Sequence, residues 1–517
     1  MSSARRYLSL WLRRLSTDRI ERHLPERADA PRVAVAPVKS AQRIWALNDA
    51  AAGLGLKPNM GLADARAMYP GIAVVEADPA ADRRLLEAIA DWCDRYTPLV
   101  GLDPPDGLVL DVTGCAHLFG GEAALCRDLL ARLQRQGFHA RVAVADTVGC
   151  AWGVARYGTP GVVPRGEACA AVQSLSTAAL RLDAETVAEL ASLGLKRVVD
   201  LEARPRAPLA ARFGEGLIRR LDQAFGRVDE PITPRLPLPA AMAEQRFAEP
   251  IAREADVLGT IEHLAHELGR VLERRGEGAR LIALALFRTD GKVHRLELGT
   301  GAPLRDAARV RKLFEERLAA LGDACDPGFG YDVVRLSALV TERCDPAQTG
   351  LAVPDHTAEL THLIDRLGAR FGLRRVTRLV PQDTHIPEYA VTAVPAHAAR
   401  RISSALAINQ DYLDQDSLGG LRPIRLLQRP EPVEATAEVP DGPPAQFTWR
   451  RVKHHVARAE GPERIAMEWW RDDRGNKLTR DYFRVESKAG ARVWLYREGL
   501  YGREVSKPRW YLHGLFA

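Results

Sequence analysis

The chain has 517 residues, 46% of them hydrophobic and 27% charged, so it holds enough apolar side chains for several packed cores. No run of about 18 apolar residues could span a bilayer, and the N-terminus lacks an apolar signal region, so we expect a globular, cytosolic protein. The 7 cysteines are scattered without a C-x-x-C pair, which argues against a zinc site and against a disulfide framework.

The net charge of +6 is concentrated at the C-terminal end. Residues 447–517 contain 16 Lys+Arg and 9 Asp+Glu, a surplus of +7, so residues 1–446 together carry about −1. Basic residues interleaved with aromatic ones suit a nucleic acid or an acidic partner. A small β-domain with a tryptophan core and a solvated basic face fits the same pattern. The five tryptophans of this segment, which we take as candidate partner-binding residues, are Trp449, Trp469, Trp470, Trp494 and Trp510.

Residues 1–170 alternate short apolar strands with amphipathic helices. The strand-like pattern of Tyr7–Leu12 predicts a first strand, and the turn-forming Asp103-Pro-Pro-Asp106 predicts the entry to a buried strand region over 102–112. The other elements expected in this part are helices over 42–56, 80–96, 122–136 and 146–156 and a strand over 140–145.

The strand that starts at Asp106 reads Asp-Gly-Leu-Val-Leu-Asp-Val-Thr-Gly. A carboxylate at a strand end suggests a metal site, and the pattern resembles the Asp-Glu-x-x-x-Asp-(Val/Leu)-Thr-Gly strand of Y-family translesion DNA polymerases. In that family the first two acids hold the magnesium ions of nucleotidyl transfer. Here the first acid is Asp106, but the second position is Gly107. Two Mg²⁺ ions about 3.5–4 Å apart need several carboxylates, which a glycine cannot supply.

Two further parts of the nucleotide site of that family have counterparts in this chain. The opening strand of the family carries a metal-binding Asp and an aromatic steric gate against ribonucleotides, and these positions correspond to Ser9 and Arg14. Residues 59–70 resemble a segment of the fingers domain. The Tyr and Arg that grip the triphosphate upstream of it correspond to Asp49 and Ala52, and a carboxylate there would repel phosphate.

The segment 146–156 resembles the Asn-Lys-x-x-Ala-Lys-x-Ala helix of the family, but Val148 and Trp152 replace its two lysines. The second lysine contacts the triphosphate in the family, so a point charge has become a large apolar surface. Phosphoryl transfer depends almost wholly on positioning and charge neutralisation. The resemblance therefore implies a polymerase fold without polymerase chemistry, with no catalytic residue, no nucleotide-binding residue, no metal site and no cofactor.

The chain continues with helices and then with a second alternating region. Asp183 is a predicted N-cap of a helix over 183–194, in a part that resembles the thumb. After a proline-rich linker, the order βαββαβ predicts a split ferredoxin-like domain that fits the little finger of Y-family proteins. Residues 245–345 contain 16 basic and 17 acidic residues, so their net charge does not indicate strong DNA binding.

Two short segments resemble sliding-clamp ligands, which are peptides with Gln and spaced apolar residues that dock in an apolar pocket. Pro423-Ile424-Arg425-Leu426-Leu427 has the apolar spacing, with Pro where Gln is expected. Gln415-Asp-Ser-Leu418 has the Gln but no aromatic residue after it. Ordinary linker or strand sequence is the competing interpretation of both segments.

Nearly the whole chain resembles the catalytically deficient Y-family homologues of bacterial SOS mutagenesis cassettes. The resemblance implies a multidomain α+β fold, with a Y-family polymerase-like right hand of palm, fingers, thumb and ferredoxin-like little finger, and a small C-terminal β-rich domain. The expected domains are palm and fingers at 1–170, thumb at 171–233, little finger at 240–345, a linker region with the candidate clamp peptide at 346–443, and a basic, Trp-rich β-domain at 444–517.

The resemblance also implies a function. It predicts a non-catalytic adapter in error-prone translesion synthesis that binds the β sliding clamp, an ImuA-type RecA-like protein, an error-prone DnaE-type polymerase and, weakly, DNA. Such a protein would be cytoplasmic and would associate with the nucleoid when DNA is damaged. Two alternatives stay open at this point: an active, low-fidelity Y-family polymerase, and a plain damaged-DNA-binding protein.

Overall fold

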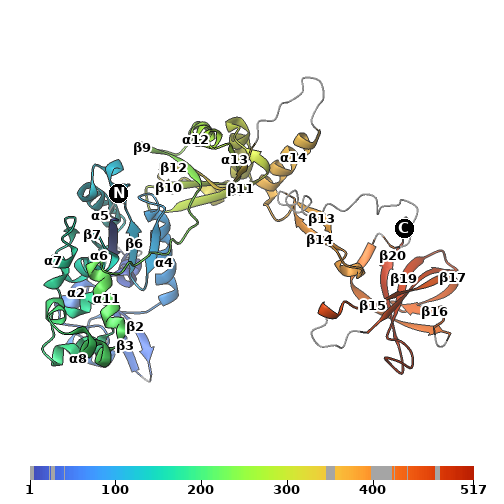
Figure 1. The fold of residues 1–517 in the computed structure, drawn as a ribbon, viewed down its shortest axis with the longest axis horizontal. Coiled ribbons are helices and arrows are strands. Elements are labelled where there is room, and N and C mark those ends of the chain that lie inside the picture. The colour runs from blue at the N-terminus through green and yellow to red at the C-terminus, as the bar shows by residue number, and fades with distance from the viewer. Residues whose placement is uncertain are drawn as a thin grey trace. The chain divides into compact units, whose positions relative to one another are not determined.

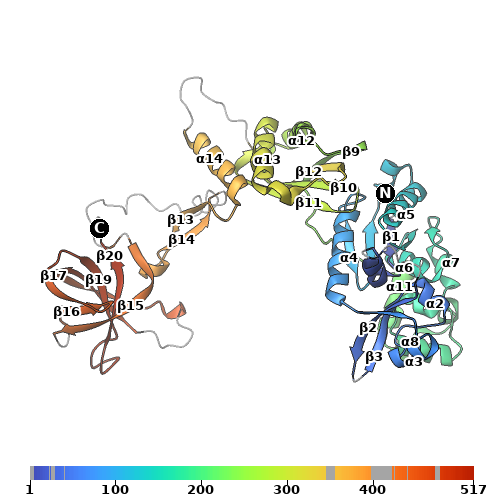
Figure 2. The same cartoon turned by 180° about the vertical axis from the view of Figure 1, so that it is seen from behind.

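The computed structural model describes residues 5–22, 24, 30–39, 41–344, 356–396, 422–423, 425–438, 441–471 and 478–516. The chain divides into two compact units, Met1–Ala352 and Val353–Ala517, which are described separately (Figures 1 and 2). Among the described residues, no helix is long and apolar enough to cross a membrane.

A five-stranded sheet lies at the centre of the palm. Its strand order is β5-β6-β1-β7-β8, and β1 pairs antiparallel with both β6 and β7. Leu8 and Leu10 of β1 are fully buried in a core formed with helices α4 and α5, because alternate residues of a strand face the same side. Ser9 and Trp11 therefore face the other side, toward α6. The elements are β1 (Tyr7–Trp11), α4 (Pro79–Cys93), β5 (Val100–Asp103), β6 (Gly107–Asp111), α5 (Glu122–Arg135), β7 (Arg141–Ala145), α6 (Val148–Tyr157) and β8 (Gly161–Val162).

The fingers contain a small sheet where the sequence predicted one long helix. The helix expected over 42–56 is wrong in its first half, because residues 41–47 pair with the neighbouring strand and only a short helix follows. Asn48 caps that helix by accepting a hydrogen bond from the Ala51 amide at 2.9 Å. The elements of this part are α1 (Leu15–Glu21), β2 (Arg32–Val38), β3 (Ala41–Leu47), α2 (Asp49–Gly53), α3 (Leu62–Met68) and β4 (Ala73–Glu76).

Short helices follow the palm and share one apolar cluster with α6. The predicted cap at Asp183 is confirmed, since its carboxylate accepts a hydrogen bond from the Thr186 amide at 2.8 Å. The elements are α7 (Ala168–Gln173), η3 (Thr177–Leu180), α8 (Ala184–Ser192), α9 (Val198–Glu202), α10 (Arg206–Phe213) and α11 (Glu215–Phe225).

The predicted βαββαβ order after the linker is confirmed. The sheet has the order β11-β10-β12-β9, and its neighbouring strands are all antiparallel. Helices α12 and α13 lie on one face of this sheet (Figure 1). The elements are β9 (Ala241–Ile251), α12 (Glu254–Arg274), β10 (Glu277–Arg288), β11 (Val293–Leu304), α13 (Ala307–Leu321), η4 (Gly322–Cys325) and β12 (Tyr331–Arg343).

The second unit contains a closed antiparallel β-barrel in which strands β15 to β20 are neighbours in chain order and β20 closes on β15. The expected C-terminal β-domain is confirmed, but its first strand begins at Arg425, upstream of the boundary at 444 that charge and tryptophan content suggested. The elements are α14 (His356–Phe371), β13 (Thr377–Pro381), η5 (Pro387–Tyr389), β14 (Val391–Pro395), β15 (Arg425–Ala437), β16 (Pro444–Trp449), β17 (Val452–Ile465), η7 (Trp469–Arg471), β18 (Arg480–Ser487), β19 (Arg492–Glu498) and β20 (Arg509–Leu515).

Candidate functional site

The position that corresponds to the metal site of the family lies where the β5–β6 turn meets helix α6. The turn Asp103-Pro-Pro-Asp106 joins two antiparallel strands, so it brings the carboxylates of Asp103 and Asp106 close to each other. Thr147 caps α6 by accepting a hydrogen bond from the Cys150 amide at 3.0 Å. Trp152 and Arg156 are four residues apart on α6, so they lie on the same side of the helix and both reach the turn.

Five side chains form what we call the palm cluster: Trp11, Asp103, Asp106, Trp152 and Arg156. The Arg156 Nη2 atom lies 3.0 Å from Asp103 Oδ2 and 3.4 Å from Asp106 Oδ1. The Trp152 indole N–H donates to Asp103 at 2.7 Å, and the Trp11 indole N–H donates to Asp106 at 2.9 Å. The guanidinium carbon is 4.2 Å from the Trp152 ring centroid and 5.6 Å from that of Trp11. A cation of the chain itself thus neutralises the carboxylates.

Burial governs the protonation of this cluster. It raises the pKa of the Asp106 carboxyl, and the hydrogen bond from Trp11 and the charge of Arg156 oppose this rise. Burial lowers the pKa of the Arg156 guanidinium, while the charges of Asp103 and Asp106 raise it. The contacts of Asp106 with Trp11 and Arg156 offset part of this effect of burial, because a buried charge without a partner is strongly unfavourable.

Gly107 is required by this arrangement. A Cβ atom at position 107 would lie 2.6 Å from Arg156 Nη2, 2.7 Å from Asp103 Oδ2 and 3.0 Å from the Asp103 carbonyl oxygen. Any side chain at this position would therefore collide with the ion pair. Gly107 and Arg156 are therefore sterically matched.

Ser9, the other position expected to have lost a metal ligand, is fully buried on β1. It lies opposite Val109 on one side and Ala143 on the other. Within the described part of the chain, its hydroxyl has no hydrogen-bond partner.

The expected triphosphate positions also interact with each other. Asp49 forms ion pairs with both Arg13 and Arg14, so the carboxylate at the family's Tyr position is joined to the guanidinium at its steric-gate position. Burial lowers the pKa of Arg14. Ala52 is exposed and contributes no polar group. The sequence interpretation considered these positions one by one. In the structure, Arg14 and Asp49 form an ion pair.

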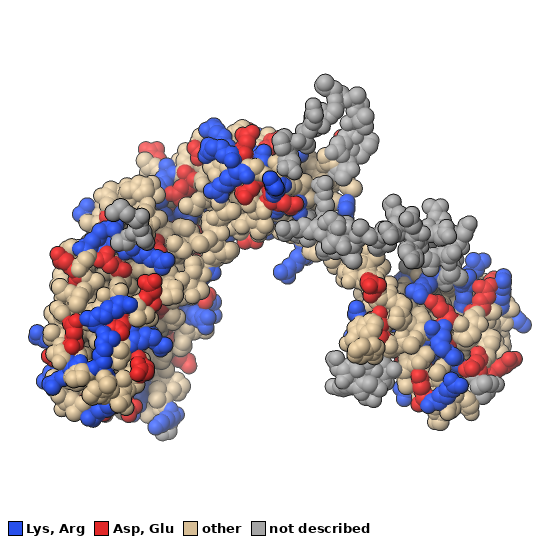
Figure 3. Space-filling view, viewed as in Figure 1, with Lys and Arg blue, Asp and Glu red and all other residues tan. Residues whose placement is uncertain are grey.

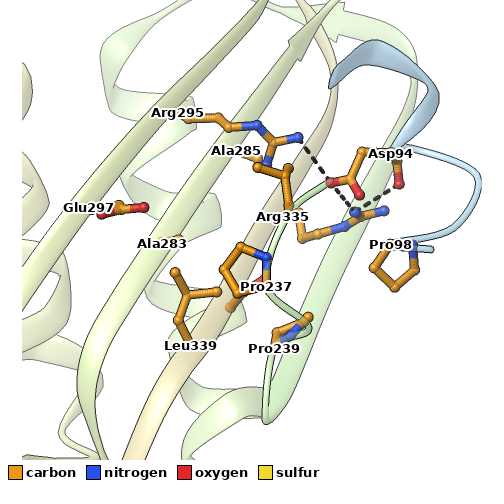
Figure 4. A pocket seen from close by; sticks show the side chains of 12 residues that line it. Asp94, Pro98, Pro237, Pro239, Ala283, Ala285, Arg295, Glu297, Arg335 and Leu339 are labelled. Carbon is orange, nitrogen blue, oxygen red and sulfur yellow. Dashed lines mark hydrogen bonds and ion pairs between the residues drawn. The ribbon is translucent and has the colours of Figure 1, made fainter. Parts of the chain in front are cut away.

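A second ionic cluster lies where the four-stranded sheet meets the end of α4. Arg335 Nη1 donates to the Asp94 carboxylate at 3.0 Å and to its carbonyl oxygen at 2.9 Å, and Arg295 donates to the same carboxylate at 3.0 Å (Figure 4). The adjoining pocket, walled by Pro98 and Pro237 among others, has a volume of about 70 Å³. That volume is well below the several hundred Å³ of typical ligand pockets. We interpret this region as a structural joint.

Arginines on a protein surface can bind DNA only where their positive charges are available to the phosphates, so we consider the pairing of the arginines in this joint. They gather on the sheet face opposite α12 and α13, but carboxylates of the protein neutralise them. Arg335, for example, is also paired with Glu244 at 2.7 Å. Figure 3 likewise shows basic and acidic side chains interspersed on the visible surface of the unit.

The five candidate tryptophans of the C-terminal domain divide into buried and exposed groups. Trp494 and Trp510 are only 2% and 9% exposed, so they are packing residues and not surface contacts. Trp449 is half-buried and donates to Glu431 at 2.7 Å. Trp469 and Trp470 are 81% and 59% exposed. Trp494 and Trp510 are therefore core residues of the β-domain. Trp469 and Trp470 remain candidates for binding a partner.

The candidate clamp peptide at 423–427 is not a free linker segment. Arg425 and Leu426 begin β15 and pair with β20, Leu427 packs against the barrel core, and Pro423 is buried close to Gly514. Its second residue, Ile424, lies outside the described residues, as do Gln415 and Leu418 of the alternative segment.

The sequence interpretation missed three members of the palm cluster: Trp11, Asp103 and Arg156. Two signals could have revealed them. Asp103 stands three residues before Asp106 across a Pro-Pro turn, and Arg156 follows Trp152 by one helical turn.

The palm sheet with its fingers, the helical thumb and the βαββαβ domain have the order of a Y-family polymerase-like protein, here followed by a β-barrel. The impB/mucB/samB family model matches residues 18–156. Protein ImuB of Caulobacter vibrioides strain NA1000 is 43% identical over 477 residues, covering 90% of this chain and 100% of that protein. DNA polymerase IV of Caulobacter vibrioides strain ATCC 19089 is 25% identical over 335 residues, covering 62% of this chain and 81% of that protein. This chain belongs to the ImuB family.

Two solved structures are also similar. DinB from Sulfolobus solfataricus has a TM-score of 0.40 at 15% identity and covers 66% of this chain and 100% of its own. The insertion ternary complex of Dbh DNA polymerase has a TM-score of 0.41 at 16% identity, with coverages of 65% and 99%.

Proposed function

We propose that this chain is a non-catalytic adapter in SOS-induced, error-prone translesion DNA synthesis. Its polymerase-like unit transfers no nucleotide. Its other surfaces bind the partner proteins, among them the polymerase that performs the transfer. The observation that carries this proposal is the position of the Arg156 guanidinium, which pairs with both Asp103 and Asp106 at the end of the palm sheet.

The palm cluster is unsuited to two-metal chemistry. Two Mg²⁺ ions require several carboxylate ligands, whereas Asp103 and Asp106 are engaged by a guanidinium and two indole N–H groups. Within the ranges that the structure describes, no group of three or more His, Cys, Asp or Glu side chains comes together as a metal site. A metal would also have to displace Arg156, and leaving its buried guanidinium without the carboxylates is unfavourable.

The nucleotide-binding side of the site is equally unsuited. The ion pairs of Asp49 with Arg13 and Arg14 occupy the region expected for the triphosphate. A carboxylate near the phosphates of a nucleotide would repel them. The lysine that contacts triphosphate in polymerases is replaced by Trp152, whose indole N–H is already donated to Asp103.

The adapter function assigns partners to the remaining parts of the chain. We propose the β sliding clamp, an ImuA-type RecA-like protein, a DnaE-type polymerase and weakly bound DNA. The clamp would contact either the start of β15, where Leu426 is 36% exposed, or the segment with Gln415 and Leu418. Leu427 is a poorer anchor because it already packs in the barrel.

A bridging assay tests the adapter function directly. Tagged clamp is mixed with the DnaE-type polymerase and the RecA-like protein, with and without the full chain. The proposal predicts that both proteins are recovered with the clamp only when the chain is present. Equal recovery without the chain would contradict an adapter function. A chain that binds damaged DNA but none of the three proteins would be a plain DNA-binding protein.

A further inference from the structure

Two neighbouring tryptophans project from the turn between β17 and β18. Trp469 and Trp470 are 81% and 59% exposed, and their rings meet edge to face, with centroids 5.6 Å apart and planes at 85°. Single exposed apolar residues are common on protein surfaces. Two adjacent indoles expose far more apolar area than single residues of ordinary size, and contiguous apolar area marks interaction surfaces.

A buried carboxylate fixes this turn. The Glu468 side chain is only 2% exposed and accepts a hydrogen bond from the Thr384 hydroxyl at 2.6 Å. It also pairs with the Arg471 Nε atom at 2.7 Å. A second link joins the His385 imidazole to the Ala466 carbonyl oxygen at 2.8 Å. We call residues 468–471 the tryptophan turn.

The anchoring of the tryptophan turn lowers the entropic cost of binding a partner there. Burying a carboxylate is unfavourable unless it is fully paired, and here the paired Glu468 stabilises a turn that buries neither indole. A rigid base reduces the entropy that the indoles would lose on binding, which favours tight association. The contacts of Glu468 therefore hold in place the stretch of backbone that carries Trp469 and Trp470.

The angle between the two indole planes favours a protein, and not a single-stranded nucleic acid, as the partner of the tryptophan turn. Successive bases stack in parallel planes, so two indoles at 85° cannot both stack on neighbouring bases. The adjacent cation is also engaged: Arg471 pairs with Glu468 and lies 5.1 Å from the Tyr389 ring centroid. A phosphate would have to compete with the Glu468 carboxylate. Tryptophan, by contrast, is enriched among the residues that dominate protein–protein binding energy.

We propose that Trp469 and Trp470 are the anchor through which the barrel binds one protein partner. That partner offers an apolar pocket with an acidic rim, since residues 447–517 carry a surplus of +7. This inference rests on the proposed adapter function. It goes further by selecting two of five candidate tryptophans and by stating the chemistry of the partner surface.

Binding measurements on the full chain test the anchor. The affinities of the purified DnaE-type polymerase and the purified RecA-like protein are measured for the natural chain, for the Trp469→Ala/Trp470→Ala double variant and for Trp45→Ala. Trp45 is a matched control because it is 47% exposed and lies in the other unit. We expect the double variant to weaken one partner by roughly 100-fold or more, as for paired hot-spot residues, and Trp45→Ala to change neither affinity.

The outcomes separate the two proposals. If the natural chain binds neither protein, the adapter function itself fails. If it binds at least one and the double variant binds equally well, the adapter function stands and the tryptophan anchor is wrong. Loss of single-stranded DNA binding with both protein affinities unchanged would also overturn the anchor.

A spectroscopic readout separates direct contact from misfolding. The chain is labelled with 5-fluorotryptophan, and the signals of positions 469 and 470 are assigned from the Trp469→Phe and Trp470→Phe variants. We expect these two ¹⁹F resonances to shift on addition of the bound partner, while those of the buried Trp494 and Trp510 stay in place. Unchanged signals at 469 and 470 in the presence of saturating partner would contradict the anchor.

Discussion

The palm cluster and the tryptophan turn use charged and aromatic residues in opposite ways. In the palm, Arg156 and two indole N–H groups satisfy Asp103 and Asp106, so the polar groups at the expected metal site are engaged within the protein. At the tryptophan turn, a buried Glu468 anchors the backbone while the indoles face solvent. The palm thus pairs its charged and aromatic side chains within the protein, whereas the tryptophan turn leaves two indoles open to solvent.

The largest effect that tests this comparison should come from removing the palm cation. Arg156→Met leaves Asp103 and Asp106 facing each other without a guanidinium, and breaking an ion pair whose cation is buried costs about 3 kcal/mol. Urea unfolding measures the loss. The control is Arg83→Met, whose exposed pair with Glu87 should contribute less than about 0.5 kcal/mol. Equal stabilities of the two variants would show that the palm cluster is not a structural unit.

The pH dependence of the barrel provides the next test. Burial lowers the pKa of His513 to about 4, below the ordinary value of 6.5. The folded barrel therefore binds this proton more weakly than the unfolded chain, and the stability linked to His513 is fully present above pH 6.5. It is lost as the pH falls from 6.5 to about 4, by up to about 3 kcal/mol.

The environment of His513 defines the control for that measurement. Its Nδ1 atom is 2.8 Å from the Tyr482 hydroxyl, and Glu388 and Arg480 are the nearby charged groups, paired with each other at 2.7 Å. His513→Gln should flatten the fall in barrel stability between pH 6.5 and 4. The same fall in both proteins would assign the pH dependence to other groups.

A smaller effect should come from filling the space at Gly107. Gly107→Ala places a Cβ atom 2.6 Å from Arg156 Nη2, and such overpacking costs about 2 kcal/mol. The cost should fall by about 1 kcal/mol in the Arg156→Met background, because the two positions share one contact. Gly53→Ala is the control, since no atom lies within 4 Å of its new Cβ. Additive effects of Gly107→Ala and Arg156→Met would disprove the steric match.

Much of the fold was predictable because it depends on local patterns. Alternation predicted β1, and helical spacing predicted α4 and α5. The order βαββαβ followed from strand and helix lengths alone. Residues 41–47 escaped this approach because pairing with β2, a tertiary contact, outweighed their helical spacing.

The site was predictable only in part. The resemblance directed attention to Asp106, where the acid is kept, and to Gly107 and Trp152, where the residue differs, but it could not supply the contacts among them. Arg156 has no counterpart in the family motif, so its role depends on α6 packing against the β5–β6 turn. The segment 423–427 resembled a linker because its pairing partner, β20, lies at the far end of the chain.

Primer extension with the purified full chain and Mg²⁺ or Mn²⁺ is the sharpest test of the proposal that the palm transfers no nucleotide. We expect no incorporation with either metal, and the same result for Asp106→Asn. Template-dependent incorporation that Asp106→Asn abolishes would contradict it, because the single carboxylate of Asp106 would then be supporting metal-dependent transfer.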